Sequence, residues 1–160
     1  MDTHEPRWLN AEERQTWLSL TAMVINLSNA LDTQLQRDAG ISHFEYQVLA
    51  TLSEAAERTM RMSDLATLSN SSLSRLSHVV KRLEKQDWVR RTPDPDNGRY
   101  TLAILTETGW EKTVATAPGH VEEVRRLVLA PLTQAQQRTL RTIGHRVNQA
   151  IAPTDTGRPD

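Results

Sequence analysis

The sequence predicts a mainly helical α+β fold, and three observations along its 160 residues support that prediction. Apolar residues recur every three or four positions in several separate segments, which is the period of an amphipathic α-helix. Between positions 88 and 105 this pattern gives way to two β-prone runs joined through Asn97-Gly98, a strong hairpin signal. No Gly or Pro lies between Ile41 and Thr92, so side-chain caps must separate the helices in that stretch.

The first expected helix follows Asn10 and ends near Gly40, a residue suited to the left-handed turn after a helix. Asn10 and Glu13 have the spacing of a capping box. At about 1.5 Å per residue, this helix would be about 40 Å long. Its apolar stripe is therefore too long to be buried inside so small a domain, which predicts a partner subunit. The stripe consists of Trp17, Leu20, Val24, Leu27, Leu31 and Leu35.

Three shorter helices should follow. Ser42-His-Phe-Glu45 is a second capping box, Ser63-Asp64 should begin a short third helix, and a fourth should follow the polar stretch 69–72. The fourth helix has an apolar stripe that would seat it in the core, formed by Leu73, Leu76, Val80 and Leu83. Its other face is hydroxyl-rich and cationic, and it carries Ser71, Ser74, Arg75, His78, Lys81, Arg82 and Lys85.

Two strands, within 88–92 and 100–105, should form the hairpin. Thr106 is placed to cap a fifth helix, in which Pro118-Gly119 predicts a kink or a break. The capping-box spacing of Thr133-Gln-Ala-Gln136 then begins a sixth helix. Three helices followed by a hairpin is the order of a winged helix-turn-helix.

Composition excludes several classes of protein. The absence of Cys excludes disulfides, thiol nucleophiles and Cys-type zinc sites. The sequence has no apolar run long enough to span a bilayer and no signal-peptide pattern, so we expect a cytoplasmic protein that makes no membrane contact. The net charge is −1, but residues 58–99 hold nine basic and five acidic side chains within an otherwise acidic chain. This asymmetry indicates a focused anionic partner.

Enzyme chemistry is not expected. Ser74 and His78 lie one helical turn apart, but no third orienting group or oxyanion loop accompanies them. The sequence has no phosphate-binding glycine loop, and its histidines are scattered without metal-ligand spacing. We therefore expect no catalytic site, no metal site and no cofactor.

Two segments resemble the MarR family of transcriptional regulators. The block from Asp64 to Arg91, DLATLSNSSLSRLSHVVKRLEKQDWVRR, is similar to the family's central signature, and DPDNGRYTLAILTETG, from Asp94 to Gly109, resembles its wing. The resemblance implies a homodimer with four regions. These are an N-terminal segment with a long dimerisation helix (1–40), the winged helix-turn-helix (41–105), C-terminal dimerisation helices (106–151) and a disordered tail (152–160).

The resemblance makes the fourth helix a recognition helix for double-stranded DNA, with a wing arginine in the minor groove. The residues expected at DNA are Ser71, Ser72, Ser74, Arg75, His78, Lys81, Arg82 and Arg99. Four alternatives stay open. Lys81, Arg82 and Lys85 would only keep the helix soluble. One serine would only cap the helix, His78 fits solvent as well as DNA, and only one of Arg90 and Arg91 can face the duplex.

The chain departs from the family pattern at two positions. Asp87 stands where the family usually has glycine after the recognition helix, so the turn there is expected to differ. Asn97 takes the acidic position of the wing's Asp-x-Arg pair, which leaves Asp96 as the expected partner of Arg99.

The family also implies a small aromatic effector between the dimerisation and DNA-binding lobes. Its expected lining is Trp17, His43, Tyr46 and Trp110, although aromatic residues at helical spacing are usually core residues. The predicted function is a sequence-specific DNA-binding regulator, a repressor bound to a pseudo-palindromic operator and released by a small ligand. The alternative is a winged-helix module that binds an acidic protein.

Overall fold

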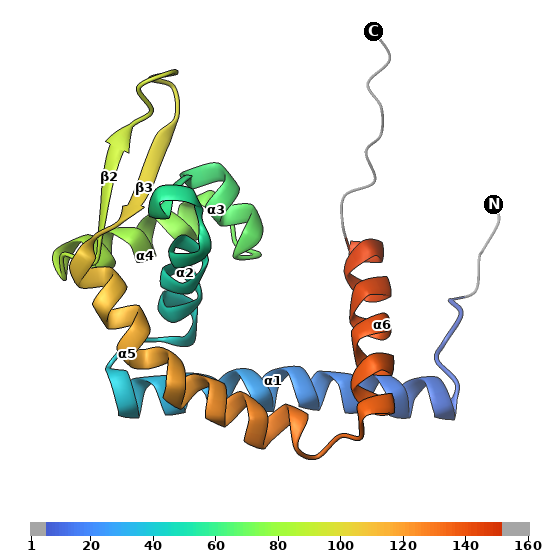
Figure 1. Cartoon of the computed structure of the whole chain (residues 1–160). Coiled ribbons are helices and arrows are strands. Elements are labelled where there is room, and N and C mark those ends of the chain that lie inside the picture. The colour runs from blue at the N-terminus through green and yellow to red at the C-terminus, as the bar shows by residue number, and fades with distance from the viewer. Residues whose placement is uncertain (1–5, 152–160) are drawn as a thin grey trace, which may run out of the picture. The chain divides into compact units, whose positions relative to one another are not determined.

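The computed structural model describes residues 6–151, which confirm the mainly helical α+β fold class (Figure 1). The helices are α1 Ala11–Ala39, α2 His43–Glu54, α3 Met62–Leu68, α4 Leu73–Lys85, α5 Glu107–Val124 and α6 Gln134–Ile151. The strands are β1 Thr59–Arg61, β2 Val89–Pro93 and β3 Thr101–Leu105. The expected tail at 152–160 lies outside the described residues. The chain divides into two compact units, Met1–Val121 and Glu122–Asp160.

Side-chain caps begin the first two helices as predicted. Asn10 Oδ1 accepts from the N–H of Glu13 at 2.9 Å, and the Glu13 carboxylate accepts from the N–H of Asn10 at 2.9 Å. Ser42 and Glu45 form the same reciprocal pair at α2. Gly40 ends α1 in the left-handed conformation, at φ 68°. These reciprocal bonds satisfy backbone donors that a helix start leaves unpaired.

The predicted start of the third helix is wrong by one residue. The helix α3 begins at Met62, and its N-cap residue Arg61 makes no side-chain cap bond. Arg61 is also the last residue of the strand β1, so the extended backbone turns directly into the helix. Ser63 Oγ instead lies 3.4 Å from Asp64 Oδ1.

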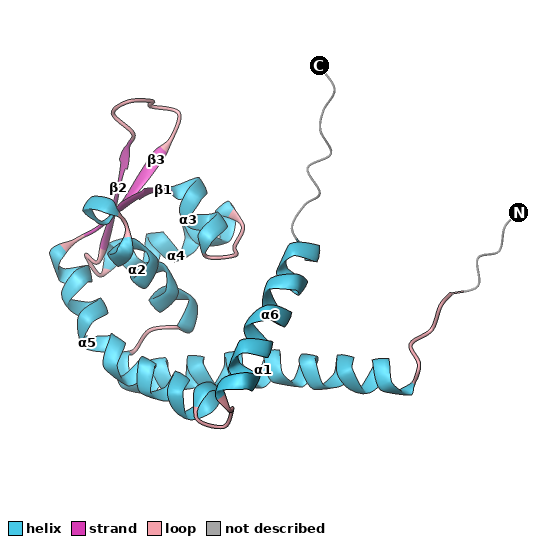
Figure 2. Cartoon of the chain, turned by 45° about the vertical axis from the view of Figure 1, so that its right-hand side comes forward, coloured by secondary structure: helices cyan, strands magenta, loops and turns pink. Residues whose placement is uncertain are grey.

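The strand β1 adds a third member to the predicted hairpin. The antiparallel order is β1-β3-β2, with Arg61 opposite Leu102 and Arg91 opposite Ala103 (Figure 2). Three residues are too few to show the alternating pattern of a strand, so β1 could not be predicted from the sequence. The β2–β3 hairpin extends beyond the helices as a wing (Figure 1).

The core lies among α2, α3, α4 and the sheet. It consists mainly of aliphatic side chains that are almost fully inaccessible to water, and the C-terminal end of α1 packs against it. Its largest fully buried members are Leu35, Ile41, Val48, Leu49, Leu52, Leu65, Leu76, Val80, Leu83 and Val89. At about 25 cal/mol per Å² of apolar surface, this burial is the main force that fixes the position of α4.

The helix α5 is held close to the end of the hairpin. Thr106 caps it as predicted, accepting from the N–H of Gly109 at 2.9 Å. A Cβ atom at Gly109 would lie 2.0 Å from the carbonyl oxygen of Trp88, so only glycine fits there. Lys112 Nζ donates to the carbonyl of Ala39 at 2.6 Å, which joins α5 to the end of α1.

Of the kink or break expected at Pro118-Gly119, the break does not occur, because α5 continues through Pro118 to Val124. A proline inside a helix removes one backbone hydrogen bond. The helical hydrogen bonds on either side of Pro118 are enough to keep α5 continuous. The irregular turn comes later, as the π-helical segment Arg125–Leu129. Such segments occur as single-turn insertions within helices.

In the second unit, Thr133 and Gln136 form the predicted capping box of α6. No residue of α6 is buried, although its apolar residues recur at helical spacing. Across residues 6–151, no helix is both long enough and apolar enough to span a membrane.

Candidate nucleic-acid interface

The helix α4 has two chemically different faces. Leu76, Val80 and Leu83 are at most 1% exposed, so this side is fixed in the core. The exposed side carries Ser74, Arg75, His78, Lys81, Arg82 and Lys85. Leu73, predicted to belong to the buried stripe, is 53% exposed. It is the first residue of the helix and extends beyond the packed core beneath the later turns.

Ser72 is the N-cap of α4, and its Oγ accepts from the N–H of Arg75 at 3.2 Å. Ser71 Oγ donates to the carbonyl of Ser72 at 3.2 Å. Ser74 is exposed on the first turn. The structure thus identifies which serine caps the helix and leaves the Ser74 hydroxyl facing outward.

Two basic side chains of α4 contact consecutive residues at the start of α2. The guanidinium carbon of Arg75 lies 4.4 Å from the ring centroid of Phe44. Arg82 Nε donates to Glu45 Oε1 at 3.0 Å. Lys81, between them in sequence, is exposed and makes no ion pair with the described residues. The basic face therefore holds two anchored arginines, together with Lys81 and Lys85, for which no ion pair occurs among the described residues.

The structure also distinguishes Arg90 from Arg91. Arg91 makes a two-pronged ion pair with Glu84, at 2.7 Å and 3.1 Å, and it donates to Ser77 Oγ at 3.3 Å. The hydrogen bond from Arg91 lowers the pKa of the Glu84 carboxyl. Arg90 points to the exposed side of the strand. Arg91 therefore joins α4 to the sheet, and Arg90 is the arginine left facing solvent.

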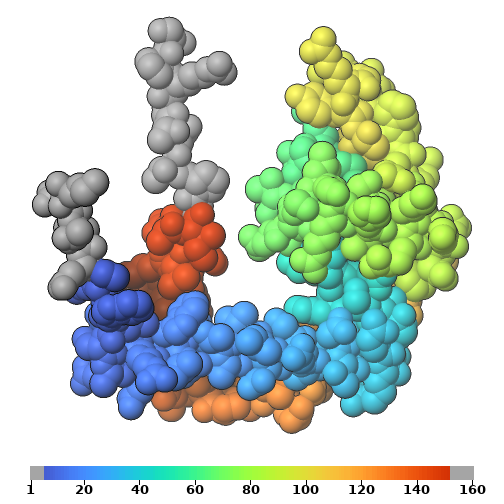
Figure 3. Space-filling model, turned by 180° about the vertical axis from the view of Figure 1, so that it is seen from behind, coloured from blue at the N-terminus to red at the C-terminus, as the bar shows by residue number. Residues whose placement is uncertain are grey.

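The wing lies next to α4. Arg99 and Tyr100 line a hollow of about 230 Å³ together with Met62, Ser63, Leu73, Ser77, Arg91 and Thr101. In Figure 3 the yellow tip of the wing projects beyond the green surface of α3 and α4. This arrangement brings Arg99 and the first turn of α4 to adjoining parts of one surface.

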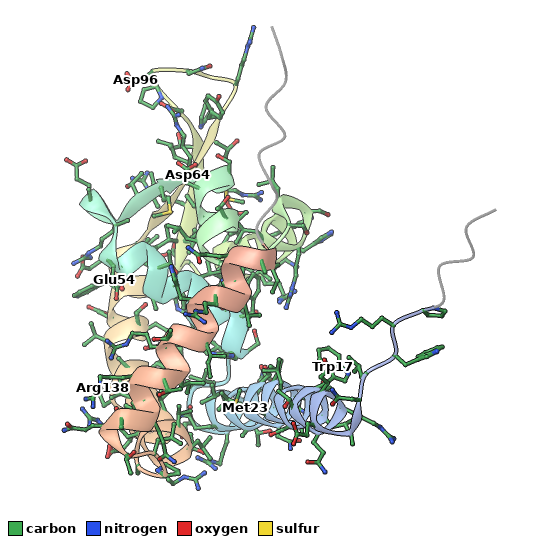
Figure 4. All side chains as sticks on the ribbon, turned by 90° about the vertical axis from the view of Figure 1, so that its right-hand side faces the viewer. Trp17, Met23, Glu54, Asp64, Asp96 and Arg138 are labelled. Atoms are coloured by element: carbon green, nitrogen blue, oxygen red, sulfur yellow. The ribbon has the colours of Figure 1, made fainter. Side chains whose placement is uncertain are left out.

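The expected ion pair between Asp96 and Arg99 is absent from the described residues. Asp96, at the tip of the wing in Figure 4, turns its N–H toward Asp94 Oδ1 at 3.0 Å. Asp94 is the acid that pairs, and its partner is Arg61 of β1. This pair could not be predicted from the sequence, because no sequence pattern indicates the strand β1 that carries Arg61.

Asp87 adopts the left-handed conformation, with φ 57°, that a glycine would favour at this position. Its N–H donates to the carbonyl of Glu84 at 3.0 Å, and its own carbonyl accepts from Thr106 Oγ1. These bonds hold the turn after α4 in place. The backbone conformation is thus kept, at the steric cost of a side chain.

The four expected effector residues are not brought to one place. The His120 ring centroid lies 4.6 Å from that of Tyr46 and 5.6 Å from that of His43. The ring of Trp110 packs under Arg58. At a rise of about 1.5 Å per residue, Trp110 lies about 15 Å from His120 along α5.

Trp17 lies near the N-terminal end of α1, as Figure 4 shows. At 1.5 Å per residue it is about 22 Å along the helix from Asp32, which accepts from the N–H of His43. Trp17 therefore cannot join a pocket around His43 within the same chain.

A polar hollow of about 450 Å³ does lie beside His43. Its lining is Ser28, Asn29, Asp32, His43, Phe44, Gln47, Ser69, Asn70 and Arg75. Burial lowers the pKa of His43, and it also lowers the pKa of His120. No group of three or more acidic or histidine side chains suited to a metal occurs within residues 6–151.

Comparisons with known proteins agree with this geometry. The sequence model of the MarR family matches residues 41–101. The chain is 45% identical to Sco3205, a MarR family transcriptional regulator from Streptomyces coelicolor whose crystal structure is a complex with DNA. That match covers 96% of this chain and 97% of Sco3205, with a TM-score of 0.92.

AbsC, another MarR family regulator from Streptomyces coelicolor, is 34% identical, with 91% and 98% of the two chains covered and a TM-score of 0.87. YdcH, an uncharacterized HTH-type transcriptional regulator of Bacillus subtilis (strain 168), is 31% identical over 80 residues, which are 49% of this chain and 54% of YdcH. The chain thus matches about half the length of this curated relative. The two-faced α4, the adjoining wing and the nearly complete matches to Sco3205 and AbsC lead to one conclusion: this chain belongs to the MarR family of transcriptional regulators.

Proposed function

We propose that this protein is a sequence-specific, double-stranded DNA-binding regulator that represses transcription. The observation that carries the proposal is the two-faced α4, whose core side is fixed while its hydroxyl and basic side faces solvent beside the wing. A helix of this kind fits the major groove of B-DNA, where its N-terminal residues reach base edges. The complex of the 45% identical Sco3205 with DNA supports the same use of this surface.

Arg75 is the proposed base reader, because it extends from the first turn of α4 and carries a planar fork of donors. To enter the groove it would leave the ring of Phe44, a contact of modest strength at an exposed site. Ser71, Ser74 and His78 lie along the same surface. Lys81 and Arg82 would contact phosphates, and Arg99 would enter the minor groove from the wing.

The protein would bind its operator as a homodimer. The N-terminal part of α1 exposes Trp17, Leu18, Val24 and Ile25, and α6 exposes Ile143, Val147 and Ile151. Apolar faces of this extent are typical of subunit interfaces. Two recognition helices about 34 Å apart would then meet successive major grooves of a pseudo-palindromic site. Occupancy of that site would block polymerase.

We further propose that a small aromatic ligand releases the DNA. The hollow of about 450 Å³ beside α4 supports this proposal, because Phe44 and Arg75 both line it. A ligand bound there would favour the conformation in which Arg75 stays on Phe44. Release follows if that conformation binds DNA less tightly.

Footprinting on the DNA upstream of the protein's own gene, across a salt series, tests the proposal. Arg75→Ala should cost about 1–3 kcal/mol on the protected site and relax preference at one base pair. Lys81→Ala should instead lower the salt slope by about one phosphate contact on any sequence. Equal weakening by Arg75→Ala on random DNA would contradict base reading. If neither this DNA nor fragments selected from the whole genome bind at low salt, the basic face serves a protein partner.

A further inference from the structure

The loop of the wing, residues 94–100, is held at both ends by a side chain that comes from outside it. Nε and Nη2 of Arg61, in β1, each lie 2.9 Å from Oδ2 of Asp94. The guanidinium carbon of Arg61 lies 4.5 Å from the ring centroid of Tyr100. The N–H of Asp94 donates to the carbonyl of Tyr100 at 2.9 Å. Arg61 therefore contacts the first and the last residue of the loop together.

The Asp94 carboxylate in turn organises the interior of the loop. Asp94 is only 6% exposed, and its Oδ1 accepts from the N–H of Asp96 at 3.0 Å. Asn97 Oδ1 accepts from the N–H of Arg99 at 3.2 Å, and the Asn97 carbonyl accepts from the N–H of Tyr100 at 3.0 Å. The hydrogen bond from Asp96 is the first cause, and Arg61 a further cause, of the lowered pKa of Asp94. The ionised Asp94 carboxylate thus links Arg61 to the backbone that carries Arg99.

We propose that Arg61 is a positioning residue for the wing, holding Arg99 in place for DNA while making no DNA contact itself. The proposal rests on the DNA-binding function proposed above. A loop that is ordered before binding loses less conformational entropy on binding, so the ordered wing binds more tightly. The charge of Arg61 is already matched by a buried carboxylate, which makes it a poor phosphate ligand.

Arg58 provides a matched control. It also pairs with a carboxylate, Glu107, at 2.8 Å, and it also lies over an aromatic ring, Trp110, at 4.1 Å. These contacts lead to α5 and not to the wing. Arg58→Met therefore removes the same charge and the same kinds of contact without releasing the loop.

The first test needs no DNA. In the full-length protein, Arg61→Met should speed amide exchange of the peptide that spans residues 94–100, because the hydrogen bonds within the loop lose their anchor. Asp94→Asn should do the same, and Arg58→Met should not. Thermal unfolding confirms that each variant is folded. Unchanged exchange in both wing variants would overturn the proposal.

The second test measures affinity for the footprinted operator duplex. Arg61→Met and Asp94→Asn should each weaken binding by about tenfold, and Arg58→Met by less than twofold. Asp94→Asn is decisive because it makes the surface more positive, which by charge alone would strengthen binding. In an Arg99→Ala background, Arg61→Met should cost no further affinity.

An equal loss in the Arg99→Ala background, or tighter binding by Asp94→Asn, would overturn the positioning role and make Arg61 a direct DNA contact. If the unaltered protein binds no DNA, the proposed function fails instead. The exchange measurement then still decides whether Arg61 orders the wing.

Discussion

The winged-helix region and the helical ends of the chain treat similar apolar patterns in opposite ways. In α2 and α4, most of the apolar residues that recur every three or four positions are fully buried; Leu52 is an example in α2 and Leu76 in α4. In α1, Trp17 and Val24 are 57% and 55% exposed, and in α6 Ile143 is 50% exposed. The same helical spacing therefore marks a finished core in one region and an unpartnered face in the other.

The difference shows what each region needs in order to be stable. The winged-helix region closes its own core, and Arg91 and Arg61 connect its elements by polar contacts. No residue in the N-terminal two-thirds of α1 is buried; its stripe becomes buried only at Leu31 and Leu35. An apolar face that stays exposed to water loses the stabilisation of burial, so a second subunit would contribute most here.

The largest expected effect comes from a charge placed in the exposed stripe. Val24→Arg should raise the dissociation constant of the proposed dimer by about a thousandfold or more, since a two-fold interface receives the unpaired charge twice. Sedimentation velocity over a concentration series measures it. Asn26→Arg, on the opposite face of α1, is the control. If the Val24→Arg protein dimerises as tightly as the control, the exposed apolar face of α1 is not the subunit interface.

The core region should respond through stability instead of assembly. Leu52→Ala should lower the free energy of unfolding by about 3 kcal/mol, because the buried methyl groups leave a cavity. Urea unfolding at a fixed protein concentration gives the value. Leu18→Ala, at an exposed position of α1, is the counterpart, and we expect it to act only where dimers form. Similar losses for both residues in a monomeric background would erase the distinction between the regions.

A smaller and opposite effect is expected at the turn after α4. Asp87→Gly should stabilise the protein by about 0.5 kcal/mol, because glycine removes the strain of a left-handed residue but adds freedom to the unfolded chain. The urea midpoint should rise with an unchanged m-value. Gln86→Gly, at the neighbouring residue with φ −93°, should lower it. A fall in the midpoint for Asp87→Gly would show that the aspartate side chain itself stabilises the turn.

The smallest expected effect is a pH dependence at the junction of α1, α2 and α5. Burial lowers the pKa of His43 and His120 below the ordinary value near 6.5, so protonation favours the unfolded chain. Stability should therefore fall as the pH drops from about 6.5 through these lowered values. The urea midpoint at pH 7.5 and 5.5 measures the fall, and His120→Gln should reduce it. His78→Gln, in the exposed face of α4, is the control; an identical fall in both variants would rule out His120 as a source of the pH dependence.

Much of the fold could be predicted from local chemistry. The caps at Asn10, Ser42 and Thr106, the left-handed Gly40 and the basic side of α4 all follow from residues within a few positions of one another. The misses involve distant partners. The strand β1 exists because β3 pairs with it. The acid of the wing that forms an ion pair is Asp94, and its partner is Arg61, thirty-three positions away, and not a neighbouring residue of the wing.

By itself, the sequence determined the order of the helices, the caps at Asn10, Ser42, Thr106 and Thr133, and which face of α4 carries hydroxyl and basic groups. These are short-range properties, set by helical periodicity and by hydrogen bonds between residues three or four apart. Only the tertiary structure decided that Arg91 belongs to Glu84, that Trp17 stays apart from His43, and that Arg61 holds the wing. Such pairings depend on which elements meet in space, and burial of the apolar core, which has no directional preference of its own, brings them together.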